Sequence, residues 1–358
     1  MSLVFSPDYF AARDRFRSAA ARLRCTIESQ TVESRGPAGE ELTIDVARQG
    51  DLRADQVVVL SSGLHGVEGP FGSAVQTAWL EAGAAPPTGT AIVLIHALNP
   101  WGYAHLRRTD DRNIDLNRNF LLAGEVYAGG PRLYGKLDPI LNPPGPPRRF
   151  DFFAARAFAA LARYGRSAVT QAIAEGQYMF PRGLFYGGNA ESEIARIVGT
   201  ALPRWIGNAR LVLHLDLHTG LGPLATCKLL TDYQLSDDQR RLSRSLGNGG
   251  LVVEPQESSS GFYHSRGGLG GWCRAKFRNR QYLLLVAEFG TYPALTVLSA
   301  LRRENQAHHA CQPGDPRFKR AKTALREVFC PASPAWRDTC VTQGLALIQS
   351  AVRAITAA

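Results

Sequence analysis

Residues 57–69 read Val-Val-Val-Leu-Ser-Ser-Gly-Leu-His-Gly-Val-Glu-Gly, an apolar run that gives way abruptly to glycine and polar residues. A short run rich in β-branched residues is typical of a strand buried on both faces of a parallel sheet. The glycines that follow favour a tight turn from strand into helix, where the backbone can approach a ligand closely. Similar apolar runs predict three more buried strands, at 91–98, 211–217 and 282–287.

Helical patterns lie between these runs, for example at 72–81, 152–175 and 191–199. Strands that alternate with helices predict an α/β fold, with a mixed, mainly parallel twisted sheet flanked by helices. Before the first buried strand, residues 6–24 predict a helix capped by Ser6. Residues 27–46 then predict two strands around a glycine-containing turn.

The chain has 358 residues and shows no internal repeat and no clean linker, so we expect a single domain over residues 1–358. One stretch departs from the alternating pattern. Residues around 123–150 are rich in glycine and proline and predict a long loop or insertion, of a kind that is often functional.

The formal net charge is +10, supplied mainly by arginine. Basic residues are scattered along the chain, and the densest groups, around Arg107-Arg108 and at 317–322, have no interleaved aromatic residues. We therefore expect neither nucleic acid nor a membrane as a partner, and a basic nucleic-acid binder is the alternative that this charge leaves open. The six cysteines form no Cys-x-x-Cys pair and no secretory signal precedes the first helix, so we expect a reduced, cytoplasmic protein.

Polar side chains follow the ends of three predicted strands. His65 and Glu68 come after the first strand, His218 after the third and Glu288 after the fourth. Because ligands of open parallel sheets bind beyond the carboxyl ends of the strands, we expect these four side chains to lie close together. Two imidazoles and one carboxylate are a donor set for zinc that leaves one position open.

Glu288 closes an otherwise apolar strand, where an isolated carboxylate is costly unless it is paired or lies at a site. Beside an open zinc position it could take a proton from bound water and pass it to a leaving amine. The alternative is a structural carboxylate that caps the next element or pairs with an arginine.

His214 and Asp216 alternate with His218 on one strand face. We expect His214 to be a hydrogen-bonded core histidine, whereas Asp216 could orient the imidazole of a metal ligand.

The loop at 107–120 is dense in arginine and asparagine and follows another strand. Arginine binds carboxylates in bidentate fashion, and asparagine supplies amide donors and an acceptor. Such a loop beside a metal could hold an anionic end of a substrate or polarise a scissile carbonyl. The alternative is a solvated polar loop with internal ion pairs.

Together these features resemble the zinc carboxypeptidase superfamily, which includes carboxypeptidase A-like peptidases and the aspartoacylase and succinylglutamate desuccinylase group. The resemblance rests on four motifs in matching order over residues 63–292: His65-Gly-Val-Glu68, Asp115-Leu-Asn117-Arg118-Asn-Phe, Asp216-Leu-His218 and Glu288. In detail the chain is similar to a bacterial branch described only as a domain of unknown function. Three features carry that similarity: Phe5-Ser-Pro-Asp-Tyr9, the Arg-Arg pair before Asp115-Leu-Asn-Arg-Asn-Phe120, and Gly183-Leu-Phe-Tyr-Gly-Gly188.

The resemblance implies a zinc carboxypeptidase-like (phosphorylase/hydrolase-like) fold and a role for each matching residue. It implies zinc ligands at His65, Glu68 and His218 and a general base at Glu288. It implies that Asn117 and Arg118 grip a terminal carboxylate. Arg107 best matches the arginine that polarises the scissile carbonyl, with Arg108 as its rival, and Tyr263 is the candidate for a mobile substrate-binding tyrosine.

We therefore expect a zinc-dependent hydrolase that cleaves an amide bond next to a free carboxylate, in a small molecule or a peptide. One alternative is an aspartoacylase-type deacylase of small N-acyl amino acids, which the same site chemistry would serve. Another is a non-catalytic metal- or ligand-binding protein on the same scaffold. One zinc ion is expected. A second ion near Asp216, His214 or His264 is left open, as is the oligomeric state.

Overall fold

Strand β3 (Gln56–Ser62) lies inside an eight-stranded sheet with the order β1-β2-β4-β3-β5-β8-β6-β7. The structure is a computed structural model, and it describes residues 4–51, 53–246, 252–254 and 265–358. Strands β4 (Thr90–His96) and β5 (Leu211–Thr219) pair in parallel on either side of β3, and β8 (Gln281–Phe289) pairs in parallel with β5. These four strands are the four predicted apolar runs.

The antiparallel pairs lie at the two edges of the sheet. Strands β1 (Thr26–Arg35) and β2 (Glu41–Gly50) form a hairpin whose second strand pairs antiparallel with β4. At the other edge, β6 (Cys227–Leu230) pairs antiparallel with β8 and parallel with the short β7 (Val252–Val253). The predicted mixed, mainly parallel sheet flanked by helices is confirmed.

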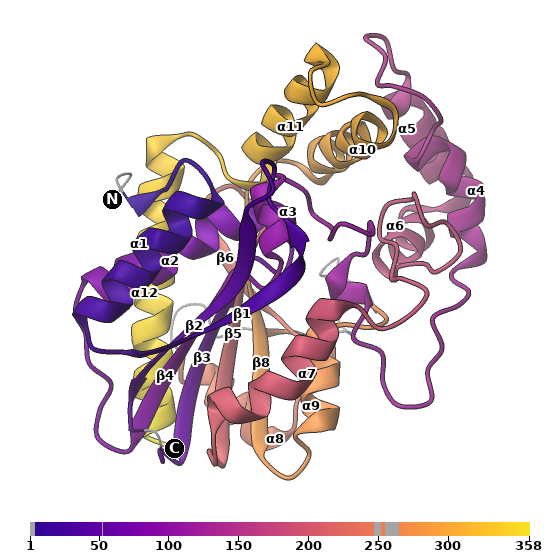
Figure 1. The fold of residues 1–358 in the computed structure, drawn as a ribbon. Coiled ribbons are helices and arrows are strands. Elements are labelled where there is room, and N and C mark those ends of the chain that lie inside the picture. The colour runs from indigo at the N-terminus through magenta and orange to yellow at the C-terminus, as the bar shows by residue number, and fades with distance from the viewer. Residues whose placement is uncertain (1–3, 52, 247–251, 255–264) are drawn as a thin grey trace.

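Helices cover both faces of the sheet (Figure 1). One face packs against α1 (Tyr9–Arg22), α2 (Gly69–Glu81) and α12 (Pro334–Thr356), and the other against α7 (Glu193–Ile206) and α9 (Leu269–Lys276). Strand β3 supplies both cores because its side chains alternate: Val58 and Leu60 face α2, whereas Val57 and Val59 face α7. Helix α8 (Asp237–Arg244) follows β6 along the chain.

A further group of helices surrounds the carboxyl ends of the central strands. The 3₁₀ helix η2 (Gly66–Glu68) packs against α3 (Pro100–Ala104) and α11 (Pro316–Phe329), and α10 (Ala294–Ala310) packs beside α11. The approach of η2 to α3 is so close that a side chain at Gly66 would clash with the backbone of Gly102. A glycine at position 66 is therefore needed for the turn that carries His65 and Glu68 to pack against α3.

The predicted glycine- and proline-rich loop at 123–150 is only partly a loop. It contains α4 (Arg132–Leu141), which packs with α5 (Phe153–Tyr164) and α6 (Arg166–Ala174) around a small core of their own, at the right of Figure 1. The predicted helix at 152–175 is broken into α5 and α6 at Gly165, whose φ of +81° only glycine adopts easily. The N-terminal helix is capped by Asp8 rather than Ser6, because the Asp8 carboxylate accepts from the Ala11 amide.

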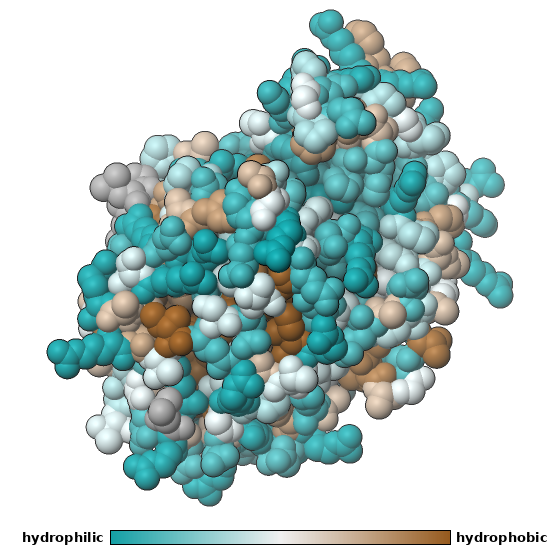
Figure 2. All heavy atoms as spheres, in the orientation of Figure 1, coloured by the Kyte–Doolittle hydropathy of each residue, from teal (hydrophilic) through white to brown (hydrophobic). Residues whose placement is uncertain are grey.

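Figure 2 shows that one face of the molecule is mainly hydrophilic, with small, separate hydrophobic patches. Within the described part of the chain, every helix is too short or too polar to cross a lipid bilayer.

Candidate metal centre

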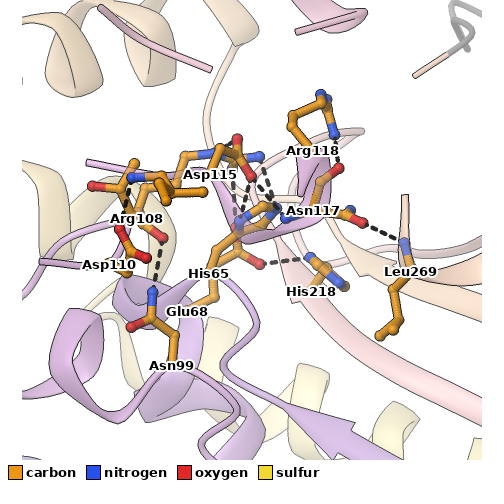
Figure 3. Close-up of polar contacts among 12 residues, drawn as sticks. His65, Glu68, Asn99, Arg108, Asp110, Asp115, Asn117, Arg118, His218 and Leu269 are labelled. Atoms are coloured by element: carbon orange, nitrogen blue, oxygen red, sulfur yellow. Dashed lines mark hydrogen bonds and ion pairs between the residues drawn. The ribbon is translucent and has the colours of Figure 1, made fainter. Parts of the chain in front are cut away.

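His65, Glu68 and His218 meet at the carboxyl ends of β3 and β5 (Figure 3). His65 caps η2, Glu68 is the last residue of η2, and His218 lies near the end of β5. One ligand atom from each residue lies within 4.8 Å of the others, and all three side chains are buried. The structure thus brings together the three residues that the sequence singles out as metal ligands, although they are up to 153 positions apart.

His218 is held between two carboxylates. Its Nε2 lies 2.6 Å from Asp216 Oδ2 and its Nδ1 lies 3.1 Å from Glu68 Oε2. Burial alone would lower the pKa of His218, but the charges of Asp216 and Glu68 outweigh it and raise that pKa well above its usual range. A metal ion at Nδ1 would take the place of the proton between His218 and Glu68, and Asp216 would continue to hold the other side of the ring.

His65 is a neutral imidazole. Its Nε2 lies 2.7 Å from Arg108 Nη2, and because arginine can only donate, the histidine must accept. Burial lowers the pKa of His65 well below its usual range, and the nearby positive charges of Arg108, His218 and Arg118 add to this. Nδ1 lies 3.4 Å from Asp115 Oδ1, yet it is buried without a hydrogen-bond partner. Because Nε2 accepts, the ring hydrogen lies on Nδ1, on the side of Asp115, and Nε2 keeps the lone pair. An imidazole lone pair beside the Glu68 carboxylate and a second imidazole fits a zinc ligand set.

Arg108, and not Arg107, lies at this centre. Its Nε donates to Asp115 Oδ2 at 3.0 Å, and its Nη1 lies 3.4 Å from Glu68 Oε1. Of the two rival arginines, the geometry therefore favours Arg108 over Arg107 as the residue that could polarise a carbonyl. The Arg107 guanidinium is buried 3.0 Å from Glu304 on α10, and it also donates to Asn113. Its buried carboxylate partner is Glu304, whereas the carboxylate partners of Arg108 include Glu68.

These two neighbouring arginines give a test by matched conservative substitutions. We expect Arg108→Lys to lower kcat/KM by about a hundredfold, because a lysine cannot reproduce the several donors with which the guanidinium contacts His65, Glu68 and Asp115. We expect Arg107→Lys to lower the free energy of unfolding by about 1–3 kcal/mol, through lost buried hydrogen bonds, with little change in kcat. Steady-state kinetics and urea unfolding of both variants measure this, and the reverse pattern would restore Arg107 as the catalytic arginine.

Glu288 faces the triad from β8. It is the register partner of His218 across the β5–β8 pair, and its Oε1 accepts from the Leu221 amide at 2.8 Å. Burial raises the pKa of Glu288 to about 7, helped by the negative charge of Glu68. A carboxyl group with that pKa can both accept and release a proton near neutrality, as a general base and acid must.

Asn117 and Arg118 lie on the 3₁₀ helix η3 (Leu116–Arg118), above His218 in Figure 3. Asn117 Oδ1 accepts from the Leu269 amide at the start of α9, which ties η3 to that helix. Arg118 is buried, donates from Nη1 to the Asn117 carbonyl, and has an Nε without a hydrogen-bond partner. Burial lowers its pKa, and the negative charges of Asp115 and Asp232 offset this only in part. A buried cation that no neighbouring carboxylate of the described residues pairs with directly is suited to bind an anion.

Residues 176–188, for which the sequence predicts no catalytic role, pack around η3. The Tyr178 hydroxyl donates to the Arg118 carbonyl at 2.6 Å, and the Tyr186 carbonyl accepts from the Asp115 amide at 2.7 Å. A Cβ at Gly176 would lie 2.5 Å from the Arg118 side chain. In the sequence, the glycine and aromatic residues at 183–188 are the feature from which this packing could have been predicted. Tyr263 and His264, named from the sequence, lie outside the described residues.

A family model described as "Protein of unknown function (DUF2817)" matches residues 5–343. No curated protein matches the chain. Three similar solved structures are thrombin activatable fibrinolysis inhibitor (12% identity, TM-score 0.47, 90% of this chain and 73% of that chain), the succinylglutamate desuccinylase of Chromobacterium violaceum (16%, 0.39, 92% and 76%) and a metallo-carboxypeptidase of Burkholderia cenocepacia (10%, 0.39, 92% and 68%). At these identities and TM-scores, the likenesses by themselves say nothing about catalysis.

Proposed function

Because the chain belongs to a family of proteins of unknown function (DUF2817), its activity has to be inferred from its site, and we propose that it is a zinc-dependent hydrolase. Its reaction would be cleavage of an amide bond next to a free carboxylate. The observation that carries the proposal is the meeting of His65, Glu68 and His218 within 4.8 Å, with Glu288 facing them from the next strand.

Each residue has a part in this chemistry. His65, Glu68 and His218 would hold the ion, whose chemistry is to polarise a carbonyl and to lower the pKa of bound water. Glu288 would accept a proton at Oε2, since Oε1 is engaged by Leu221, and would release it to the departing nitrogen. Arg108 would donate to the carbonyl oxygen as negative charge develops there.

The free carboxylate is inferred from Arg118. Its guanidinium is buried, positively charged and without an ion-pair partner in the described structure, and it lies close enough to His65 to lower the pKa of that residue. A substrate carboxylate would pair with this guanidinium directly, and Asn117 beside it could add a hydrogen bond.

The test compares substrates that differ at one group. A panel of short peptides and N-acyl amino acids is offered with either a free carboxylate or a carboxamide beside the scissile amide. We expect the carboxamide to lower kcat/KM by about a hundredfold or more, because it leaves the Arg118 guanidinium buried and unpaired. Arg118→Met should lower the activity on the free acid and abolish this preference. Equal rates on acids and amides by the wild-type protein would refute the carboxylate requirement.

A further inference from the structure

A chain of hydrogen bonds runs from His218 into the core of the sheet. Asp216 Oδ1 lies 2.6 Å from Ser61 Oγ, Ser61 Oγ lies 2.7 Å from His214 Nε2, and His214 Nδ1 lies 2.8 Å from the Tyr282 hydroxyl. These residues come from three neighbouring strands, β3, β5 and β8 (Figure 1). All four are at most 2% exposed. Such a row of polar groups inside an apolar sheet is costly unless every member is paired, and here each one is.

The chemistry of the groups fixes the direction of each bond. The Asp216 carboxylate can only accept, so Ser61 donates its hydroxyl hydrogen to Oδ1. The Ser61 oxygen is then left as an acceptor for an N–H at His214 Nε2. Burial lowers the pKa of His214 to about 4, so the ring is neutral and its Nδ1 accepts from the Tyr282 hydroxyl. One arrangement of hydrogens satisfies the whole chain.

The far end of the chain is held by packing. The Tyr282 ring stacks on Phe277 at a centroid distance of 5.0 Å, with the two planes only 8° apart. At the near end, Asp216 presents its other oxygen, Oδ2, to His218 Nε2. The Tyr282 side chain, held by this stacking, is thus connected to the His218 imidazole through hydrogen bonds that each have one donor and one acceptor.

We propose that Ser61, His214 and Tyr282 are positioning residues that lock the Asp216 carboxylate in place, so that His218 keeps a hydrogen on Nε2 and presents Nδ1 to the metal ion. This inference rests on the proposed function for the identity of the ion, but the hydrogen arrangement within the chain does not. The ring of a histidine ligand must be fixed in both orientation and tautomer for tight metal binding. Here the residues that fix the His218 ring include Ser61, His214 and Tyr282 as well as the Asp216 carboxylate.

The test measures zinc affinity by competition with a chelator, and the His214 tautomer by ¹⁵N chemical shifts in the metal-free protein. We expect Ser61→Ala to weaken zinc binding by about tenfold relative to the wild-type protein. Ser61→Thr, which keeps a hydroxyl, should retain most of the wild-type affinity. Tyr282→Phe should have a smaller effect in the same direction. The wild-type His214 should carry its hydrogen on Nε2, and Ser61→Ala or Tyr282→Phe should disturb that tautomer.

Ser73→Ala is the matched control. Ser73 pairs with another buried histidine, since its Oγ lies 2.9 Å from His96 Nε2. Among the described residues, no hydrogen bond connects this pair to His65, Glu68 or His218. Zinc affinity that falls equally in Ser61→Ala and Ser73→Ala, or in neither, would overturn the positioning role, as would a wild-type His214 protonated on Nδ1. If the wild-type protein binds no zinc at all, the proposed function fails, whereas the His214 tautomer still tests the hydrogen-bond chain.

Discussion

Glu288→Gln is expected to lower kcat by about a thousandfold and to leave the metal content of the protein unchanged. Glutamine has nearly the same shape and its side-chain oxygen can still accept from the Leu221 amide. It cannot, however, take up a proton from water or return one to a leaving nitrogen. The fold and the ligands His65, Glu68 and His218 should therefore be preserved while the proton transfer is lost.

Glu304→Gln provides the matched control for this substitution. Glu304 is also a buried glutamate, but its carboxylate pairs with Arg107 and Lys322. We expect this variant to lose stability, because two buried cations lose their counter-charge, and to keep most of its kcat when folded. Near-normal turnover in Glu288→Gln would remove Glu288 from the mechanism.

The double variant His65→Ala/His218→Ala is expected to lose its metal completely, whereas the wild-type protein should bind about one zinc ion per chain. The two substitutions remove both imidazoles and leave Glu68 as a single carboxylate ligand. Elemental analysis of the purified proteins, after zinc has been supplied and excess removed, measures this directly. His96→Ala removes an equally buried imidazole elsewhere and should retain the ion.

Each outcome of that metal analysis has a distinct meaning. About two ions per wild-type chain would indicate a co-catalytic centre and additional ligands. Metal that persists in the double variant would place the binding site elsewhere. Absence of metal from the wild-type protein would contradict the hydrolase proposal and favour a non-catalytic binding protein on the same scaffold.

The central strands and the meeting of the four polar side chains follow from short-range features of the sequence. Runs such as 57–61 and 211–217 are dense in β-branched and leucine residues, which suit strands buried on both faces. Once those strands are parallel, the residues at their carboxyl ends must meet at one edge. This is why His65 and Glu288 could be assigned to one site although more than two hundred residues separate them.

The choice between Arg107 and Arg108 could not be made in this way. The two residues are adjacent and chemically identical, and what separates them is a buried carboxylate, Glu304, contributed by α10 almost two hundred positions later. The helix α4 inside the glycine- and proline-rich stretch was missed for a similar reason, because its stability comes from packing against α5 and α6 rather than from its own sequence.

The polar residues of the site come together only if β3, β5 and β8 pair in the observed register. Ser61 is opposite Asp216, and His218 is opposite Glu288, in unbroken ladders that begin at Gln56, Leu211 and Gln281 at the far end of the strands. A slip of one residue would turn a whole strand's side chains to the opposite face. The positions of His218, the proposed metal ligand, and Glu288, the proposed base, therefore depend on the pairing of apolar residues elsewhere along the same strands. A core substitution that loosens this pairing would displace both residues together without altering either one.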